Sequence, residues 1–414
     1  MYTKSQRAEA DEILTIGSIL PVIALISCYL TSRVAAQYGT QFNFSQVTAF
    51  PGQKLQSLSW KAPRPLKFQH WYPAFGYYLA TISNETCSLT LRAYEGSLSA
   101  RVELPPVTTY CGAHLSCILS IAQEAAKANI AATTVLLGLT PSILAFLGPT
   151  IAEVSLLSLR RPILAILVSL GAPAICPTRI GTYDDPSAVY ELGTGALVVP
   201  EIPRPFSILV SVAQYLLAAC AASNVFQVSY DIGIRSVMSW ACEFSYLPFF
   251  WTLLTGVIHL FAALALRISL SKPKDQGSSS TDAKSLRNWS IQFLYRECTL
   301  SANNSTSHQL ENMRVGPMGI ALNGFAGWFG IVHMAFGTAI FSGALFISTG
   351  DAATLILRYL ASGTMCRLII YFEVGGMRRV KEKSNQFKWI VQSRNLEIVD
   401  ATQVTSVEEE RGRK

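Results

Sequence analysis

The amino-acid sequence predicts an all-α fold, a polytopic bundle of six or seven transmembrane helices with one large extracytoplasmic loop of mixed structure. Half of the 414 residues are hydrophobic and only 14% are charged, whereas soluble globular chains carry about 25% charged residues. The mean hydropathy is +0.33. Several uninterrupted apolar runs have about the 20 residues that a helix needs to cross a bilayer.

The first apolar run, residues 13–31, is long enough to cross a membrane, so we predict that residues 1–32 form a first anchor. The basic flank with Lys4 and Arg7 and the small residues at 34–36 are also typical of a cleaved secretory signal peptide. Both alternatives remain open, and the length of the run favours the anchor.

Residues 33–128 form a polar loop that we expect to lie on the extracytoplasmic side. The loop contains N-glycosylation sequons at Asn43 and Asn84, which are used in proteins of the secretory pathway. Two of its segments, 77–82 and 87–94, have the composition of strands. The sequence therefore predicts a glycoprotein of the secretory pathway or the plasma membrane.

The same loop carries three cysteines, Cys87, Cys111 and Cys117. Disulfides form on the oxidising side of a membrane. We therefore expect one disulfide among these three residues and one thiol left over.

Residues 129–266 are predicted to form the first part of the bundle, with apolar runs at 129–148, 162–176, 205–227 and 246–266. The second of these runs would be about 22 Å long as a helix, which is short for a span. It is either a short span with Arg160 and Arg161 at one end, or a re-entrant or interfacial segment.

Residues 267–326 are predicted to be a polar, basic loop and residues 327–372 a transmembrane hairpin. Residues 373–414 form a basic tail that we expect to be disordered or to form a short surface helix. The basic side chains that follow the last apolar run predict contact with anionic lipids. They are Arg378, Arg379, Lys381 and Lys383. The predicted partners are thus the bilayer and acidic lipids, and no nucleic acid.

The positive-inside rule and the sequons disagree about a seven-span topology. Seven spans would place the basic loop and the basic tail outside, although Lys and Arg near span ends favour the cytoplasmic side. Treating 162–176 as non-spanning gives six spans and places both termini and the basic loop in the cytoplasm. We prefer this six-span arrangement.

Sequence motifs for catalysis are missing. The chain has no GxSxG, GxGxxG, P-loop or HExxH pattern and only five histidines. The prediction is that the protein is not an enzyme and has no catalytic residues, cofactor-binding residues or metal ligands.

Ionisable residues inside the apolar runs are the candidate functional groups, because charges at this depth are costly and usually face a bundle interior or a wet cavity. The candidates are His259, His333, Asp351, Arg358 and Arg367. A functional interpretation is a polar substrate or proton path lined by His259, His333 and Arg358.

The structural interpretation of the same residues is that the histidines are hydrogen-bonded between helices and that Arg358 pairs with Asp351, seven residues away on one helix face. We weigh this interpretation above the functional one. The equally spaced Glu153 and Arg160 are expected to form a similar structural pair.

Two blocks resemble a known family. NxAATTVLLGLTPxxLAxLGPxxAExxLLSxxRP followed by LGAP, at 129–173, is similar to uncharacterised multi-pass integral membrane proteins of filamentous fungi. The block SxGDAxxxxLRxLAS…CRLIxxFEVxGM, at 348–377, is similar to the same group. The resemblance covers about half of the chain and implies a membrane location. The family has no assigned activity, so it implies no site residues.

The function predicted from the sequence is that of a non-enzymatic membrane protein, receptor-like or a scaffold. The alternative is a transporter or channel that uses the intramembrane histidine and arginine groups. A membrane-embedded enzyme ranks third, because the chain shows no cluster of acids or histidines at one membrane face.

Overall fold

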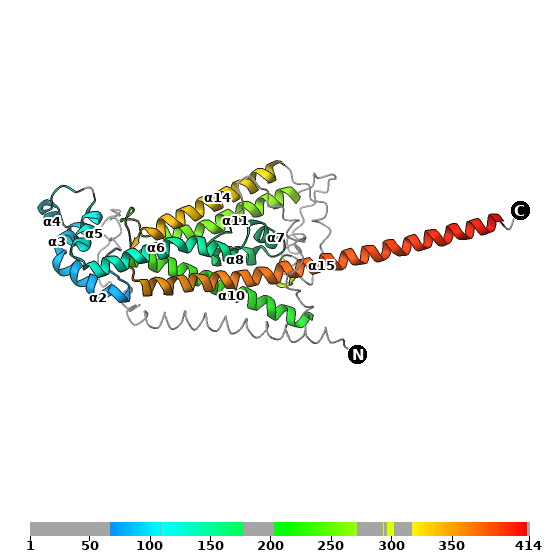
Figure 1. The fold of residues 1–414 in the computed structure, drawn as a ribbon, viewed down its shortest axis with the longest axis horizontal. Helices are drawn as coiled ribbons and strands as arrows, with labels where there is room; N and C mark the ends of the chain where they lie inside the picture. Colours follow the sequence, from blue (N-terminus) through cyan, green and yellow to red (C-terminus); the bar gives the residue numbers. More distant parts are fainter. Residues whose placement is uncertain are drawn as a thin grey trace, which may run out of the picture.

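The computed structural model describes residues 67–107, 109–176, 203–270, 293, 296–301 and 317–411, with side chains as far as Val380. The predicted first span, 13–31, and the sequon at Asn43 lie outside these residues. Figure 1 shows a long helical bundle with a small group of helices at one end and a single helix leaving the other end.

Five of the described helices are long and apolar enough to cross a membrane, and they make the protein a multi-pass membrane protein. These helices are α6 (Glu124–Leu147), α10 (Arg204–Arg235), α11 (Leu247–Leu270), α14 (Pro317–Ser342) and α15 (Thr349–Arg411). The small helices at the end of the bundle form what we call the head. They are α2 (Pro73–Thr81), the π-helix η2 (Ile82–Thr86), α3 (Ser88–Tyr94), α4 (Leu98–Glu103) and α5 (Tyr110–Ile121).

The head corrects the prediction of a loop with strands, because 77–82 and 87–94 are both helical. Their aromatic and aliphatic residues, which are also common in strands, here pack into a helical core. That core includes Leu79, Ile82 and Ile118 together with the disulfide-bonded cysteines. Tertiary packing has overridden a local preference that spans only about 1 kcal/mol.

A pair of two-residue strands joins the head to the bundle. β1 (Val237–Met238) follows α10, and β2 (Ala344–Leu345) precedes α15; the two pair antiparallel. Next to β2, Phe346 adopts a positive φ of 68° and is fully buried, with its ring 5.4 Å from the ring of Trp71 in the head. The connections α10–α11 and α14–α15 therefore form the surface on which the head rests.

Lys67 strengthens the contact between head and bundle. Its Nζ donates to the carbonyl oxygens of Gly233 at 2.6 Å and Ser236 at 2.7 Å, at the end of α10. A cation is favourable at a helix C-terminus. Burial nevertheless lowers the pKa of Lys67 to about 8.

The apolar run at 162–176 does not cross the bundle. It forms α8 (Pro162–Gly171), which follows α7 (Ile151–Arg160) after a single-residue break. The chain returns toward its starting point, since the Cys176 amide donates to the Pro149 carbonyl at 3.2 Å. Helices α7 and α8 thus form a hairpin whose arms are each about 15 Å long, and neither arm is among the candidate spans. The re-entrant or interfacial alternative stays a prediction.

The direction of the spans places the basic segments opposite the head. α11 ends, and α14 begins, at the end of the bundle that lies away from the head, and α15 leaves the bundle at that same end (Figure 1). Excluding the hairpin leaves five described spans. The total of six or seven remains a prediction, because the first span lies outside the described residues.

Helix α15 differs most from the sequence prediction. It continues without a break to Arg411, although residues 373–414 were predicted to form a disordered tail or a short surface helix. The part beyond Val380 is about 30 residues and about 45 Å long, and Figure 1 shows it extending away from the bundle.

Close packing of α11 on α14 gives a first testable prediction. A Cβ at Gly337 would lie 2.7 Å from Cε2 of the fully buried Trp251. We expect Gly337→Ala to destabilise the protein by about 1–3 kcal/mol, as overpacked core positions do. Thermal unfolding of the purified protein measures this loss.

Gly324 in the same helix is the matched control, because a Cβ there meets nothing within 4 Å. Gly324→Ala should be neutral or slightly stabilising, since Ala is the better helix former. Equal melting temperatures for the two variants would contradict the packing argument.

Candidate functional site

The tip of the α7–α8 hairpin positions a fully buried charge of the bundle, that of Arg161. Arg161 separates α7 from α8 because Pro162 cannot continue a helix and disfavours the helical conformation of the preceding residue. Arg161 accordingly has φ −133° and ψ 73°, yet its amide still donates to Leu157 and its carbonyl still accepts from Ala165. Its side chain is fully buried and points into the bundle.

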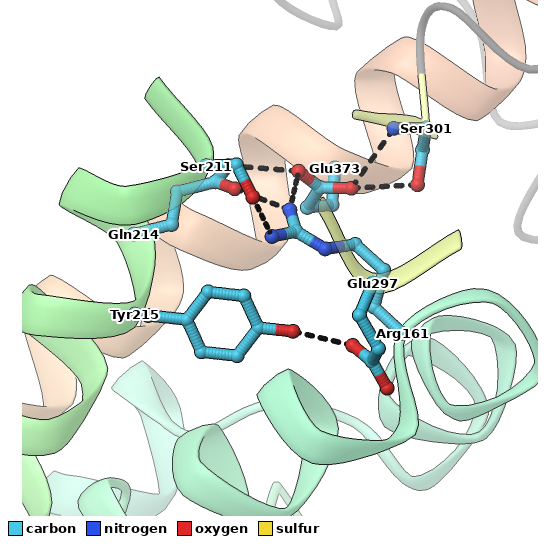
Figure 2. A network of polar contacts seen from close by, with 7 residues as sticks. All are labelled: Arg161, Ser211, Gln214, Tyr215, Glu297, Ser301 and Glu373. Atoms are coloured by element: carbon cyan, nitrogen blue, oxygen red, sulfur yellow. Dashed lines mark hydrogen bonds and ion pairs between the residues drawn. The ribbon is translucent and has the colours of Figure 1, made fainter. Parts of the chain in front are cut away.

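Arg161 forms an ion pair with Glu373 of α15 (Figure 2). Nη1 of Arg161 lies 2.7 Å from Oε1 of Glu373, and both side chains are completely buried. Arg161 also donates to Gln214 and, at 2.5 Å, to Ser211, both on α10. The guanidinium thus joins the hairpin to two spans.

The Glu373 carboxylate is saturated with donors. Oε1 accepts from Arg161 and from Nε2 of Gln214 at 2.8 Å. Oε2 accepts from the Ser301 hydroxyl at 2.6 Å and the Ser301 amide at 3.2 Å. Such complete pairing of the carboxylate offsets the several kcal/mol that burying this ion costs.

A second carboxylate ties the segment 296–301 to the same place. Glu297 accepts from the Tyr215 hydroxyl (Figure 2). It also accepts, at 3.0 Å, from the amide of Ile163 at the start of α8. The guanidinium of Arg161 also lies 5.1 Å from the centre of the Tyr215 ring. We call Arg161, Ser211, Gln214, Tyr215, Glu297, Ser301 and Glu373 the tip network.

Glu153 has a partner other than the one the sequence suggested. Its carboxylate pairs with Arg367 of α15 and also closes a capping box with Thr150 at the start of α7. Seven-residue spacing pointed to Arg160 on the same helix. Arg367, whose guanidinium lies 4.4 Å from the centre of the Tyr371 ring, reaches Glu153 because α15 packs against α7.

Arg358 and Asp351 also differ from the expected pair. Arg358 donates to the side chains of Asn224 at 2.9 Å and Gln227 at 3.1 Å, both on α10. Asp351 accepts from the Ser348 hydroxyl at 2.8 Å at the start of α15. A small cavity nevertheless borders both residues. Its lining consists of Tyr72, Asp231, Arg235, Asp351, Thr354, Leu355 and Arg358.

The two intramembrane histidines lie between α11 and α14, away from the α10 contacts of Arg358. Nε2 of His333 donates to the Trp251 carbonyl at 2.8 Å, and the Trp251 indole donates to the His333 carbonyl at 3.0 Å. The two rings stack 5.0 Å apart. His259 is 2% exposed, and neither ring nitrogen has a hydrogen-bond partner among the described residues.

The structure therefore brings the two histidines near each other and places Arg358 in a different interface. This arrangement gives no support to a polar substrate or proton path lined by His259, His333 and Arg358 together. Among the described residues, no group of three or more His, Cys, Asp or Glu side chains is placed to hold a metal ion.

Disulfides fix the head and correct the expected leftover thiol. Cys87 pairs with Cys117, and Cys111 pairs with Cys242 in the α10–α11 connection. Cys242 lies outside the loop 33–128, for which the disulfide was predicted, and is 131 residues from Cys111. The second bond covalently joins the head to the bundle. Asn84, the sequon residue, is exposed on η2.

His114 organises the interior of the head. Its Nδ1 lies 2.8 Å from the Thr90 hydroxyl and its Nε2 lies 2.9 Å from the Ser83 hydroxyl. Thr90 donates its proton to the Cys87 carbonyl, so Nδ1 carries the proton and Nε2 accepts from Ser83. Ser83 is fully buried, and its contact with His114 joins η2 to α5 inside the head.

Burial lowers the pKa of His114 to about 4, which gives a prediction about acid. The folded state binds the proton more weakly than the unfolded state, whose histidine pKa is about 6.5. The contribution of His114 to the free energy of unfolding is therefore fully present above pH 6.5 and is lost as the pH drops from 6.5 to 4. We expect a loss of about 2 kcal/mol between pH 7 and pH 5 in a pH series of unfolding.

A non-titrating residue at position 114 should remove that slope. His114→Gln is expected to flatten the stability profile between pH 7 and pH 5, whatever it costs at pH 7. His70→Gln is the comparison; His70 is more exposed, and partial burial and Arg235 lower its pKa as well, so this variant should remove a smaller part of the slope. A profile that His114→Gln leaves unchanged would assign the pH dependence to other groups.

Sequence reasoning missed several residues of these sites. Glu373, Gln214, Asn224 and Cys242 are single polar residues in or beside apolar runs, and nothing in their spacing links them to their partners. The one available signal was that Glu373 is an acid directly after the apolar run that ends at residue 372, because ionisable residues at membrane depth are functional candidates by default. The tail boundary set at residue 373 obscured it.

Comparisons of the chain with protein-family models, with curated proteins and with solved structures gave no match. The resemblance to fungal membrane proteins stays a prediction. The structure itself establishes an integral, multi-pass membrane protein.

Proposed function

We propose that this protein is a non-enzymatic, receptor-like or scaffold protein of the secretory pathway or plasma membrane. The observation that carries the proposal is α15, which begins beneath the head and continues as one helix to Arg411 on the opposite side. Its first residue, Thr349, is held by α6, because the Thr349 amide donates to the Asn129 side chain at 3.0 Å. A single rigid element thus connects the two faces of the membrane.

The buried charges support a structural role for the bundle. Glu373 is engaged by donors from the hairpin, from α10 and from the segment 296–301. A carboxylate with four donors is poorly suited to proton transfer or substrate binding, since both roles need an available oxygen. The tip network instead fixes the position of α15 where that helix leaves the bundle.

The proposed orientation places the head on the extracytoplasmic side. Two disulfides hold the head, and disulfides persist in oxidising compartments. Arg378 and Arg379 lie in the last turn of the last span, at the opposite end, which the positive-inside rule assigns to the cytoplasm. There they, with Lys381 and Lys383, contact anionic lipids of the inner leaflet. We expect Asn84→Gln to lose a glycan when the variant and the wild type are compared after endoglycosidase treatment, and that result would support this orientation.

Truncation after Val380 tests the function. This variant keeps the head and every described span, so an enzyme or transporter built in the bundle keeps its activity. A receptor or scaffold loses the part of α15 beyond Val380, through which it acts in this proposal. In cells that lack the gene, we expect the truncated chain to reach the membrane with an unchanged melting temperature and to fail to restore the wild-type phenotype. Full restoration would overturn the proposal.

A transporter is the second candidate, because the small cavity between α10 and α15 is lined by two acids and two arginines. Flux into proteoliposomes that disappears in Arg358→Gln, while the truncated chain retains it, would favour this alternative. Arg358 then acts through its contacts with Asn224 and Gln227.

A further inference from the structure

Large aromatic side chains are exposed at the end of the bundle that carries the head. Trp240, Phe244 and Tyr246 belong to the α10–α11 connection, and Phe250 lies in the first turn of α11. Their exposed fractions are 54%, 47%, 58% and 46%. Exposed apolar side chains that gather in one place mark a contact with a membrane or a partner. We call these four residues the aromatic surface.

Trp240 shows at which level of the bundle this surface lies. Its indole nitrogen donates to the Ala339 carbonyl at 3.0 Å, and a Cβ at Gly343 would lie 2.7 Å from the same nitrogen. Ala339 is in the last turn of α14, and Gly343 follows that helix. The ring therefore lies beside the end of a candidate span, and its polar atom is bonded within the protein.

The length of α11 indicates the same level. Exposed apolar residues recur on one face of this helix from Phe250 to Ile268. Between these two they are Leu253, Val257, Leu260, Phe261 and Leu264. A helix from 250 to 268 is about 27 Å long, close to the hydrocarbon thickness of about 30 Å. If this face meets the acyl chains along its whole length, the boundary on the head side falls between Tyr246 and Phe250.

The charge of the α10–α11 connection lies beside the head. Glu243 is the only charged residue of 236–246. Burial, followed by the Glu243 carboxylate, raises the pKa of Tyr94 in α3 to about 12, and such an influence requires the two groups to be near each other. Cys242 is bonded to Cys111 of the head. The connection thus has a charged side next to the head and an uncharged aromatic side at the ends of the spans.

We propose that the aromatic surface lies in the headgroup layer of the bilayer on the head side, with the rings of Trp240 and Tyr246 at the boundary between headgroups and acyl chains. Trp and Tyr favour this layer because their rings are apolar and carry one polar atom. The exposed face of α11 continues into this surface at Phe250. The contact sets how far the head extends from the bilayer, and it does not depend on the proposed receptor or scaffold function.

The test measures tryptophan fluorescence of the purified full-length protein in phosphatidylcholine nanodiscs. Phosphatidylcholine brominated close to the headgroup quenches at the boundary, phosphatidylcholine brominated close to the chain ends quenches in the core, and iodide quenches from water. The signal of Trp240 is the difference between the wild type and Trp240→Phe. We expect this signal to lose most intensity with the bromine close to the headgroup, and less with either of the other quenchers.

Trp328 of α14 is the matched control, because its exposed fraction of 52% is close to that of Trp240. It precedes Ala339 by about 16 Å along the helix axis, which places it in the core of the bilayer. The signal removed by Trp328→Phe should therefore lose most intensity with the bromine close to the chain ends. The signal removed by Trp71→Phe, in the head, should be insensitive to both brominated lipids.

Two results would overturn the proposal. A Trp240 signal that iodide quenches and neither lipid quenches would place the connection in water, with its aromatic surface open to a protein partner. A signal that the chain-end bromine quenches most would place the connection inside the hydrocarbon core. If Trp240→Phe does not fold, Phe244→Trp decides between the same outcomes, because the added ring belongs to the same surface and its signal is the excess over the wild type.

Discussion

Arg161→Met is expected to destabilise the protein by about 3–5 kcal/mol, the largest effect of any single side chain in the bundle. Removing one partner of a buried ion pair leaves the other charge buried and uncompensated. Here the abandoned group is Glu373, which is completely buried and would retain only the donors of Gln214 and Ser301. Unfolding of the purified protein, monitored by heat or denaturant, measures the loss.

The double variant Arg161→Met/Glu373→Met separates the attraction within the ion pair from the cost of burying its two charges. Replacing both ions by apolar groups of similar size is often neutral or stabilising, so the double variant should be more stable than Arg161→Met alone. Lys127→Ala is the surface control, since Lys127 pairs with an exposed Glu124 at 2.8 Å and such pairs contribute at most about 1 kcal/mol. Similar losses of stability for Arg161→Met and Lys127→Ala would show that the buried pair does not stabilise the protein more than a surface pair does.

Loss of the Cys111–Cys242 disulfide is the second large effect. The bond closes a loop of 131 residues, and the chain-entropy relation assigns about 5 kcal/mol to a loop of that size. We expect Cys111→Ser/Cys242→Ser to lower stability by about 2–5 kcal/mol and to increase hydrogen exchange in the head, because the covalent tie to the α10–α11 connection is gone.

The internal bond of the head provides the comparison. Cys87 and Cys117 are only 30 residues apart, so Cys87→Ser/Cys117→Ser should cost about 1 kcal/mol less than the other pair. Exchange in β1 and β2 should rise in the Cys111–Cys242 variant and stay low in the Cys87–Cys117 variant. The reverse order in both measurements would show that the head is not held to the bundle through Cys242.

The membrane character of this protein follows from its sequence alone. Long uncharged runs are unfavourable in water, and in lipid a helix satisfies the hydrogen bonds of its own backbone. The runs at 129–148 and 246–266 therefore predicted the spans that the structure has as α6 and α11. The run at 162–176 was recognised as short for a span, and the structure has it as the ten-residue helix α8. These are local properties, and local properties can be read from one stretch of sequence.

Side-chain partners were decided only by the tertiary structure. Seven-residue spacing suggested Glu153 with Arg160 and Asp351 with Arg358, yet the structure bonds Glu153 to Arg367 and Arg358 to Asn224. The sequence also did not predict the helices of the head or the partner of Cys111. A buried charge takes its partner from whichever helix packs against it, and helix packing depends on contacts between residues more than one hundred positions apart.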